Sequence, residues 1–194
     1  MARENKKFIF GAVRKGGRAA DFEMAIQWLV DAGLVYKVER SKEPVMSLKF
    51  YADNAAFKLY MLDCGLLACM AEANPNAMLL GTNAFTEFKG AFTENYVLQQ
   101  IKATLGTTPY YFSKDNSTMK VDFLYQTQEK EVPMEVEAEE NVKSKSLSNF
   151  IKEDFKNLNL KGLRCGMKPY IDHGWMENIL LYAIESYLKS KSHY

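Results

Sequence analysis

Acidic side chains at alternating positions of one segment are the residues best suited to chemistry in this sequence. Within residues 120–138, apolar side chains recur at every second position on either side of a central turn. This period of two predicts a β-hairpin. If the turn is centred between Gln128 and Glu129, Asp122 faces Glu135 and both side chains leave the same side of the sheet. Cross-strand partners lie about 5 Å apart, so two carboxylates there repel each other. A bound cation would reverse that repulsion.

A helix expected over residues 82–105 supplies further acidic groups. Glu87 and Glu94 are seven residues apart and therefore project from nearly the same stripe of this helix. Gly90 and Ala91 lie between them, and such small residues allow the helix to approach a sheet edge closely. From the helix alone, ordinary surface charges are the simpler interpretation of both glutamates.

The elements around the hairpin predict an α/β sandwich. Beyond the helix and the hairpin, the expected elements are a strand at 110–113, a helix at 144–157, a strand at 162–168 and an apolar run at 179–188. Helix, three strands, helix and strand in this order are typical of an α+β unit with a mixed central sheet.

The first part of the chain predicts a separate, winged-helix-like module. Its expected elements are a helix at 21–33, strand-like runs at 34–39 and 47–51, and a second helical segment at 54–70. A loop at 73–82 contains an Asn-Pro-Asn turn signal and is the best boundary. We therefore divide the chain into a winged-helix-like module with its connecting helix, 1–72, and a second domain, 73–194.

A basic, glycine-rich loop precedes the first helix. Its spacing from Gly11 onward imitates a phosphate-binding P-loop, but Gly17 stands where the lysine belongs, and no buried strand precedes it. Arg14, Lys15 and Arg18 are instead candidates for contacts with DNA phosphates. The alternative is a small packing domain whose basic side chains are only solvated.

Composition narrows the class of protein. With 47% apolar residues and a formal net charge of +1, the 194-residue chain predicts a folded globular protein and argues against a polyanion-coating one. Three cysteines without paired spacing suggest reduced thiols. No secretory signal and no run long enough to cross a bilayer are present, which predicts a cytoplasmic protein without membrane contact. His173 and Trp175 are interpreted as a lone histidine and a packing residue.

Several segments resemble one known family. FKGAFTENYV (88–97), VDFL (121–124), PMEVE (133–137) and KSKSL (143–147) resemble domain of unknown function DUF4143, the C-terminal part of prokaryotic AAA-type ATPases. AIQWLVDAGL (25–34) and FKLYMLDCGL (57–66) resemble the segment that precedes that domain in the same proteins. The resemblance implies an ATPase module as partner, although no ATPase motif occurs in this sequence.

The resemblance also implies a restriction-endonuclease-like fold of the PD-(D/E)XK type. Carried over by position, Glu94 is the helical acid, Asp122 the first strand acid and Glu135 the second, and the three would surround Mg²⁺ or Mn²⁺. Such a metal accepts hard oxygen ligands and turns a bound water toward a phosphodiester.

One position departs from the nuclease pattern. Glu137 occupies the place of the lysine that helps to stabilise charge during cleavage. Lys143 or Lys145, from the following helix, are candidates to replace it.

Three functions therefore stay open. The first is a nuclease-fold accessory module of an AAA-type ATPase, impaired in cleavage and used to recognise nucleic acid or a partner. The second is an active Mg²⁺-dependent DNase, and the third is a winged-helix DNA-binding protein with a structural C-terminal domain. Exposed apolar side chains near residues 8–10 or 59–67 would favour self-association.

Overall fold

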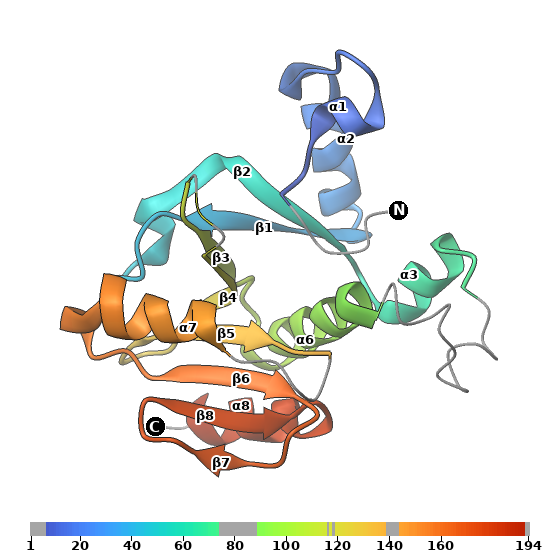
Figure 1. The fold of residues 1–194 in the computed structure, drawn as a ribbon. Coiled ribbons are helices and arrows are strands. Elements are labelled where there is room, and N and C mark those ends of the chain that lie inside the picture. The colour runs from blue at the N-terminus through green and yellow to red at the C-terminus, as the bar shows by residue number, and fades with distance from the viewer. Residues whose placement is uncertain (1–6, 74–88, 116, 118, 139–143, 193–194) are drawn as a thin grey trace.

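A mixed β-sheet runs through both halves of the chain (Figure 1). The computed structural model describes residues 7–73, 89–115, 117, 119–138 and 144–192. Over these residues eight strands pair in the order β2-β1-β3-β4-β5-β6-β8-β7, with both parallel and antiparallel neighbours. The expected α+β class with a mixed sheet is confirmed. The winged-helix and endonuclease-like assignments stay predictions, as does the division at residue 72.

The N-terminal elements form a hairpin with helices on either side of it in the chain. They are α1 (Phe10–Val13), α2 (Ala19–Asp31), β1 (Val35–Ser41), a 3-10 turn (Leu48–Tyr51), β2 (Ala52–Met61) and α3 (Cys64–Met70). Strand β1 pairs with β2 on one side and in parallel with β3 on the other, through Arg40 and Tyr111. The hairpin thus extends the sheet of the second half.

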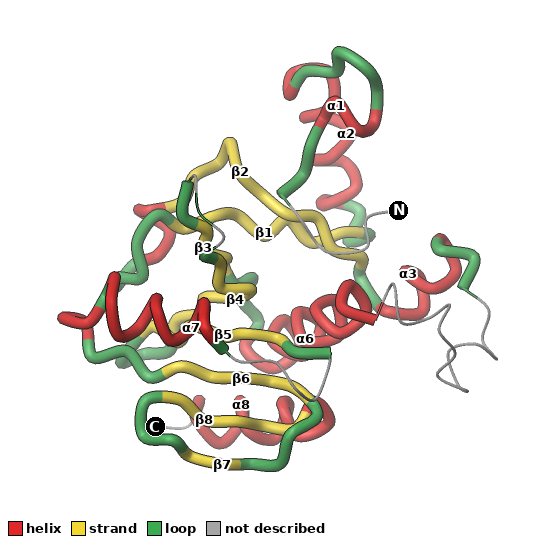
Figure 2. Tube along the Cα trace, in the orientation of Figure 1, coloured by secondary structure: helices red, strands yellow, loops and turns green. Residues whose placement is uncertain are grey.

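The C-terminal elements build most of the sheet and its two helical layers. They are α6 (Lys89–Leu105), β3 (Tyr110–Ser113), β4 (Lys120–Gln126), β5 (Glu131–Val136), α7 (Lys145–Asn149), a π-helical turn (Phe150–Asp154), a 3-10 turn (Lys156–Leu158), β6 (Gly162–Gly166), β7 (Ile171–Asp172), β8 (Met176–Leu180), a 3-10 turn (Leu181–Ala183) and α8 (Ile184–Ser192). The tube in Figure 2 shows α6 and α8 on one side of the sheet and α7 on the other.

Each face of the central strands is covered by its own apolar cluster. On the α6 and α8 face, Ile101 and Leu188 pack against Phe123 and other core side chains. On the α7 face, Leu147 and Phe150 belong to a second cluster. Because both faces are covered, β4 is buried along its interior and only its two ends are exposed.

Two secondary-structure predictions in the N-terminal part were wrong. Residues 54–61, expected to begin a helix, belong to strand β2, and the helix that follows begins only at Cys64. Residues 48–51, expected as a strand, form a 3-10 turn. The apolar residues of 54–61 suit the period of a helix as well as that of a strand. Pairing of β2 with β1 over seven positions selects the strand.

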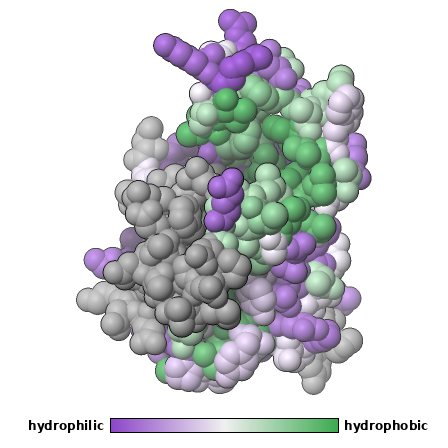
Figure 3. Space-filling model, turned by 90° about the vertical axis from the view of Figure 1, so that its right-hand side faces the viewer, coloured by the Kyte–Doolittle hydropathy of each residue, from purple (hydrophilic) through white to green (hydrophobic). Residues whose placement is uncertain are grey.

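Helix α2 is confirmed, but its apolar residues are poorly covered. Only Ile26 is buried on it, whereas Met24 and Trp28 keep 67% and 68% of their surface exposed. The face turned toward the viewer in Figure 3 carries a hydrophobic area below a hydrophilic tip. The N-terminal helices therefore contribute little to the core.

A buried amide holds strand β2 against helix α6. The Asn95 side chain accepts a hydrogen bond from the Met61 N–H at 2.9 Å and donates one to the Met61 carbonyl at 3.2 Å. Asn95 is 2% exposed. Water therefore does not readily replace its amide as the hydrogen-bond partner of these backbone groups.

We predict that Asn95→Ala destabilises the protein by about 2–3 kcal/mol, because both backbone groups of Met61 lose a partner. Urea unfolding followed by circular dichroism measures the change. Gln99→Ala, on the same helix, is the matched control and should cost less than about 1 kcal/mol. Equal losses in the two variants would contradict this role for Asn95.

Candidate functional site

The β4–β5 hairpin brings two of the predicted acids together. The antiparallel ladder includes Phe123 opposite Met134, and the same register places Asp122 opposite Glu135. The turn is centred as the sequence predicted, with the Thr127 N–H donating to the Lys130 carbonyl at 2.9 Å. The Asp122 carboxylate accepts a hydrogen bond from a backbone N–H of β5, that of Val136, at 3.0 Å. Asp122 is 5% exposed, so this carboxylate is fixed within the sheet.

Helix α6 carries the third predicted acid, Glu94, into the same region. Its Oε2 accepts a hydrogen bond from the Tyr60 hydroxyl at 3.0 Å and lies 3.5 Å from the Lys58 ammonium. Both partners come from strand β2, and the Lys58 ammonium also lies 5.2 Å from the centre of the Tyr111 ring. Burial raises the pKa of Glu94, and the positive charge of Lys58 opposes that rise. Glu94 is therefore a buried acid with a dedicated counter-ion.

Glu137 completes the acidic cluster at the end of β5. Its N–H donates to the Cys165 carbonyl at 2.9 Å, which keeps the chain beside β6. A Cβ on Gly166 would lie 3.0 Å from the Glu137 carbonyl oxygen, so glycine permits this close approach. Burial raises the pKa of Glu137 to about 7, and the charges of Glu135 and Asp122 add to the rise. Near neutral pH this carboxyl is therefore only partly ionised.

Besides Lys58, cations from two strands, β4 and β6, partly offset the acids. The Lys120 ammonium lies 3.9 Å from Asp122 Oδ1, an ion-pair distance that is too long for a hydrogen bond. Lys120 also lowers the pKa of Glu94, Glu135 and Glu137, and Arg164 of β6 lowers that of the last two. The effect of burial is larger for each of these three carboxyls, so their pKa values stay raised.

Two carboxylate oxygens in the cluster are buried without a hydrogen-bond donor. They are Asp122 Oδ1 and Glu135 Oε2, on neighbouring strands. Within the described residues no group of three or more His, Cys, Asp or Glu side chains is arranged to hold a metal ion. Mg²⁺ keeps several waters and needs only one or two carboxylates, so the pair Asp122 and Glu135 has the donor chemistry for it. Glu94 is instead engaged by Lys58 and Tyr60.

The basic residues predicted from the sequence lie elsewhere or outside the described residues. Lys143 belongs to 139–143, which lie outside them. Lys145 is exposed at the start of α7 and lines a small cavity with Arg164. Arg14, Lys15 and Arg18 lie around the loop between α1 and α2, at the end of the molecule away from β4 and β5 (Figure 1). Arg14 pairs with Asp21 at 2.8 Å, which reduces the positive charge of this loop.

Five residues of the site were missed by the sequence analysis. They are Lys58, Tyr60, Lys120, Ser144 and Arg164. The signal for Lys120 was present, because a residue two before Asp122 on a strand shares its face. Lys58 and Tyr60 were hidden by the wrong helix prediction for β2. The contacts of Ser144 and Arg164 join segments distant in sequence, and no local pattern indicates them.

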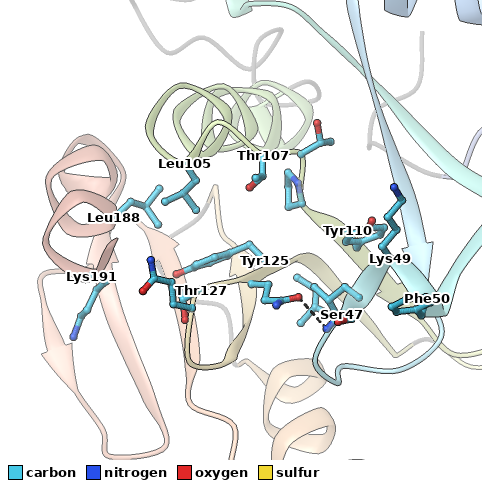
Figure 4. Close-up of a pocket in the computed structure, with 16 residues that line it drawn as sticks. Ser47, Lys49, Phe50, Leu105, Thr107, Tyr110, Tyr125, Thr127, Leu188 and Lys191 are labelled. Carbon is cyan, nitrogen blue, oxygen red and sulfur yellow. Dashed lines mark hydrogen bonds between the residues drawn. The ribbon is translucent and has the colours of Figure 1, made fainter. Parts of the chain in front are cut away.

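A cavity of about 730 Å³ lies at the other end of the hairpin, near its turn. In Figure 4 the side chains of Leu105, Tyr125 and Leu188 border it, while Lys49 and Lys191 lie on opposite sides. Its walls mix apolar groups with hydroxyl and amide groups, and none of the candidate acids lines it. The acid cluster and this cavity are thus separate features.

Two family models match separate parts of the chain. Residues 89–173 match the family model described as Domain of unknown function (DUF4143), which confirms the resemblance over the segment that contains Glu94, Asp122, Glu135 and Glu137. Residues 1–77 match Domain of unknown function (DUF8612). Searches among curated proteins and among solved structures gave no match. None of the helices in the described residues is long and apolar enough to cross a membrane.

The raised pKa of Glu137 predicts a pH-dependent stability. In the unfolded chain this carboxyl ionises near its usual pKa of 4.5, and in the folded protein at about 7. The folded state therefore holds more protons in that interval, and stability falls as pH rises through it. We expect Glu137→Gln to flatten the fall by about 2 kcal/mol, measured by urea unfolding across the same interval. Glu129→Gln, in the exposed turn, should keep the wild-type slope, and an unchanged slope in Glu137→Gln would refute the assignment.

The pair Lys58 and Glu94 predicts strong energetic coupling. Lys58→Met removes the counter-ion of a buried carboxylate and should cost about 3 kcal/mol at neutral pH. The double variant Lys58→Met, Glu94→Gln should recover part of that loss, because no buried charge is left without a partner. Urea unfolding of both single variants and the double variant gives the coupling energy. Strictly additive losses would show that the contact contributes nothing.

Proposed function

We propose that this chain is a nuclease-fold accessory region of an AAA-type ATPase, impaired in cleavage, that recognises nucleic acid. The observation that supports it best is the pair of buried, donor-free oxygens, Asp122 Oδ1 and Glu135 Oε2, on adjacent strands. The DUF4143 match covers both residues. In this proposal the C-terminal part is of the PD-(D/E)XK type and the N-terminal part is winged-helix-like.

Asp122 and Glu135 would hold one Mg²⁺ or Mn²⁺ ion, and Glu94 would act as a neighbouring acid. The bound ion would lower the pKa of a coordinated water and so supply the nucleophile for a phosphodiester. The chain's own contribution is to hold Asp122 through the Val136 N–H and to compensate Glu94 through Lys58.

Cleavage is impaired in this proposal because of Glu137. Its carboxyl, whose pKa is raised to about 7 by burial and by the charges of Glu135 and Asp122, is partly ionised at neutral pH. It therefore adds negative charge, and supplies no cation, where charge develops on the phosphate during cleavage. The phosphodiester would therefore bind weakly unless a metal ion offsets the acids.

Lys120 favours a second candidate, an active Mg²⁺-dependent DNase. Its ammonium lies 3.9 Å from Asp122 Oδ1 and could take over the role of the missing lysine from the start of β4.

The basic loop with Arg14, Lys15 and Arg18 favours the third candidate, a winged-helix DNA-binding protein. Its test is DNA binding that is lost when these three residues are neutralised and survives Asp122→Ala.

The proposal includes a cytoplasmic location and an ATPase module as partner. The exposed side chains of Met24 and Trp28 on α2 offer an apolar surface for that module or for a second copy of the chain. Light scattering of this chain over a range of concentrations would distinguish a monomer from a self-associating protein.

Calorimetric titration with Mg²⁺ and Mn²⁺ tests the metal site directly. Wild type should bind one ion, and Asp122→Asn should weaken binding by at least about tenfold because a charged ligand is lost. Glu129→Gln, at the far end of the same hairpin, should bind the ion as wild type does. Equal affinity in all three proteins, or no binding at all, would refute the metal site.

Nicking of plasmid DNA tests the impairment. Glu137→Lys should raise the Mn²⁺-dependent rate by about tenfold or more, because it restores a cation where charge develops. Asp122→Asn in the same background should abolish that gain. If wild type already cleaves efficiently and Lys120→Ala abolishes cleavage, the DNase alternative is correct.

A further inference from the structure

A small cavity beside the acid cluster is lined by basic and polar groups. It measures about 320 Å³ and lies between α7 and the β6–β8 part of the sheet. Among its lining residues are Lys145 and Ser148 of α7, Arg164 of β6, and Trp175 just before β8. None of the lining residues is acidic, in contrast to the neighbouring cluster.

Arg164 is held in place by a chain of polar contacts. Its Nε donates to Asn178 Oδ1 at 2.8 Å, and its Nη1 donates to Ser144 Oγ at 3.0 Å. Asn178 is 2% exposed and lies 3.1 Å from a ring nitrogen of His173. A guanidinium fixed in this way loses little conformational freedom when it binds an anion.

The cavity is joined to the acid cluster through Ser144. The Ser144 hydroxyl bonds to Glu135 as well as to Arg164, and Glu135 and Arg164 are direct partners across β5 and β6. One strand register thus places a carboxylate site and a guanidinium site side by side. A ligand with phosphates at regular spacing can present one phosphate to the guanidinium, and it can present the next to the carboxylates only when a metal ion offsets their charge.

We infer that Lys145, Ser148 and Arg164 bind a backbone phosphate of a single nucleic-acid strand, with Trp175 as the apolar wall beside it. The two cations and the hydroxyl suit a phosphate. The Trp175 indole offers a flat surface to a sugar or base. The Lys152 ammonium lies 4.1 Å from the centre of this ring. The choice of substrate rests on the proposed function, but the cavity and its charge do not.

Fluorescence titration with single-stranded oligothymidylate tests the inference. Trp28→Phe is used as the background, so that Trp175 is the reporter, and we expect its emission to be quenched. Lys145→Ala should weaken binding by about fivefold and lower the salt dependence by about one counter-ion. Ser148→Ala should weaken it by about threefold. Lys156→Ala, an exposed lysine outside the cavity, is the matched control and should bind as the background protein does.

The outcomes separate this inference from the metal site. Binding that depends on Lys145 and Ser148 and persists in Asp122→Asn supports the phosphate pocket, even where metal titration has refuted the metal site. Equal binding by the Trp28→Phe background and by Lys145→Glu in that background overturns the pocket, as does equal competition by polyglutamate. An oligonucleotide that binds no more tightly than inorganic phosphate overturns the assignment to a strand.

Discussion

Compensation of one buried carboxylate ties helix α6 to the N-terminal hairpin, beside the pairing of β1 with β3. Glu94 lies on α6, but its hydrogen-bond donor and its counter-ion, Tyr60 and Lys58, both lie on β2. An ionised carboxylate in this position would be costly without them. Asn95, the next residue on α6, bonds to the backbone at the end of the same strand. Two successive polar residues of α6 therefore fix its position relative to the N-terminal hairpin.

The rest of the acid cluster is a balance between burial and nearby cations. Burial raises the pKa of Glu135 and Glu137, while Lys120 and Arg164 lower both. The balance is incomplete, since two carboxylate oxygens, on Asp122 and Glu135, have no donor. Binding of a proton, a further cation or a metal ion stabilises such groups. This incomplete balance distinguishes the acid cluster from the larger cavity near the hairpin turn, which none of these acids lines.

Opposite charges lie side by side in this protein because parallel strands share a register. Glu135 of β5, Arg164 of β6 and Asn178 of β8 form one row across the sheet. Ser144, which precedes α7, bonds to the first two of them. The row passes from the acidic residues of β5 to the basic residue of β6. We propose that a ligand with phosphates contacts this row.

The sequence by itself determined the features that depend on neighbours in the chain. The period of two and the turn at 127–130 define the register of the β4–β5 hairpin, and hence that Asp122 faces Glu135. The apolar stripe of α6 and the resemblance to DUF4143 from residue 88 to residue 147 could likewise be recognised from the sequence, and the family model matches 89–173. The tertiary structure decided the rest. Residues 54–61 suit a helix or a strand, and only pairing with β1 selects the strand. The contacts of Glu94 follow from that pairing, and the row through Arg164 follows from the crossover after β5. Both join residues far apart in the sequence, so no local pattern predicts them.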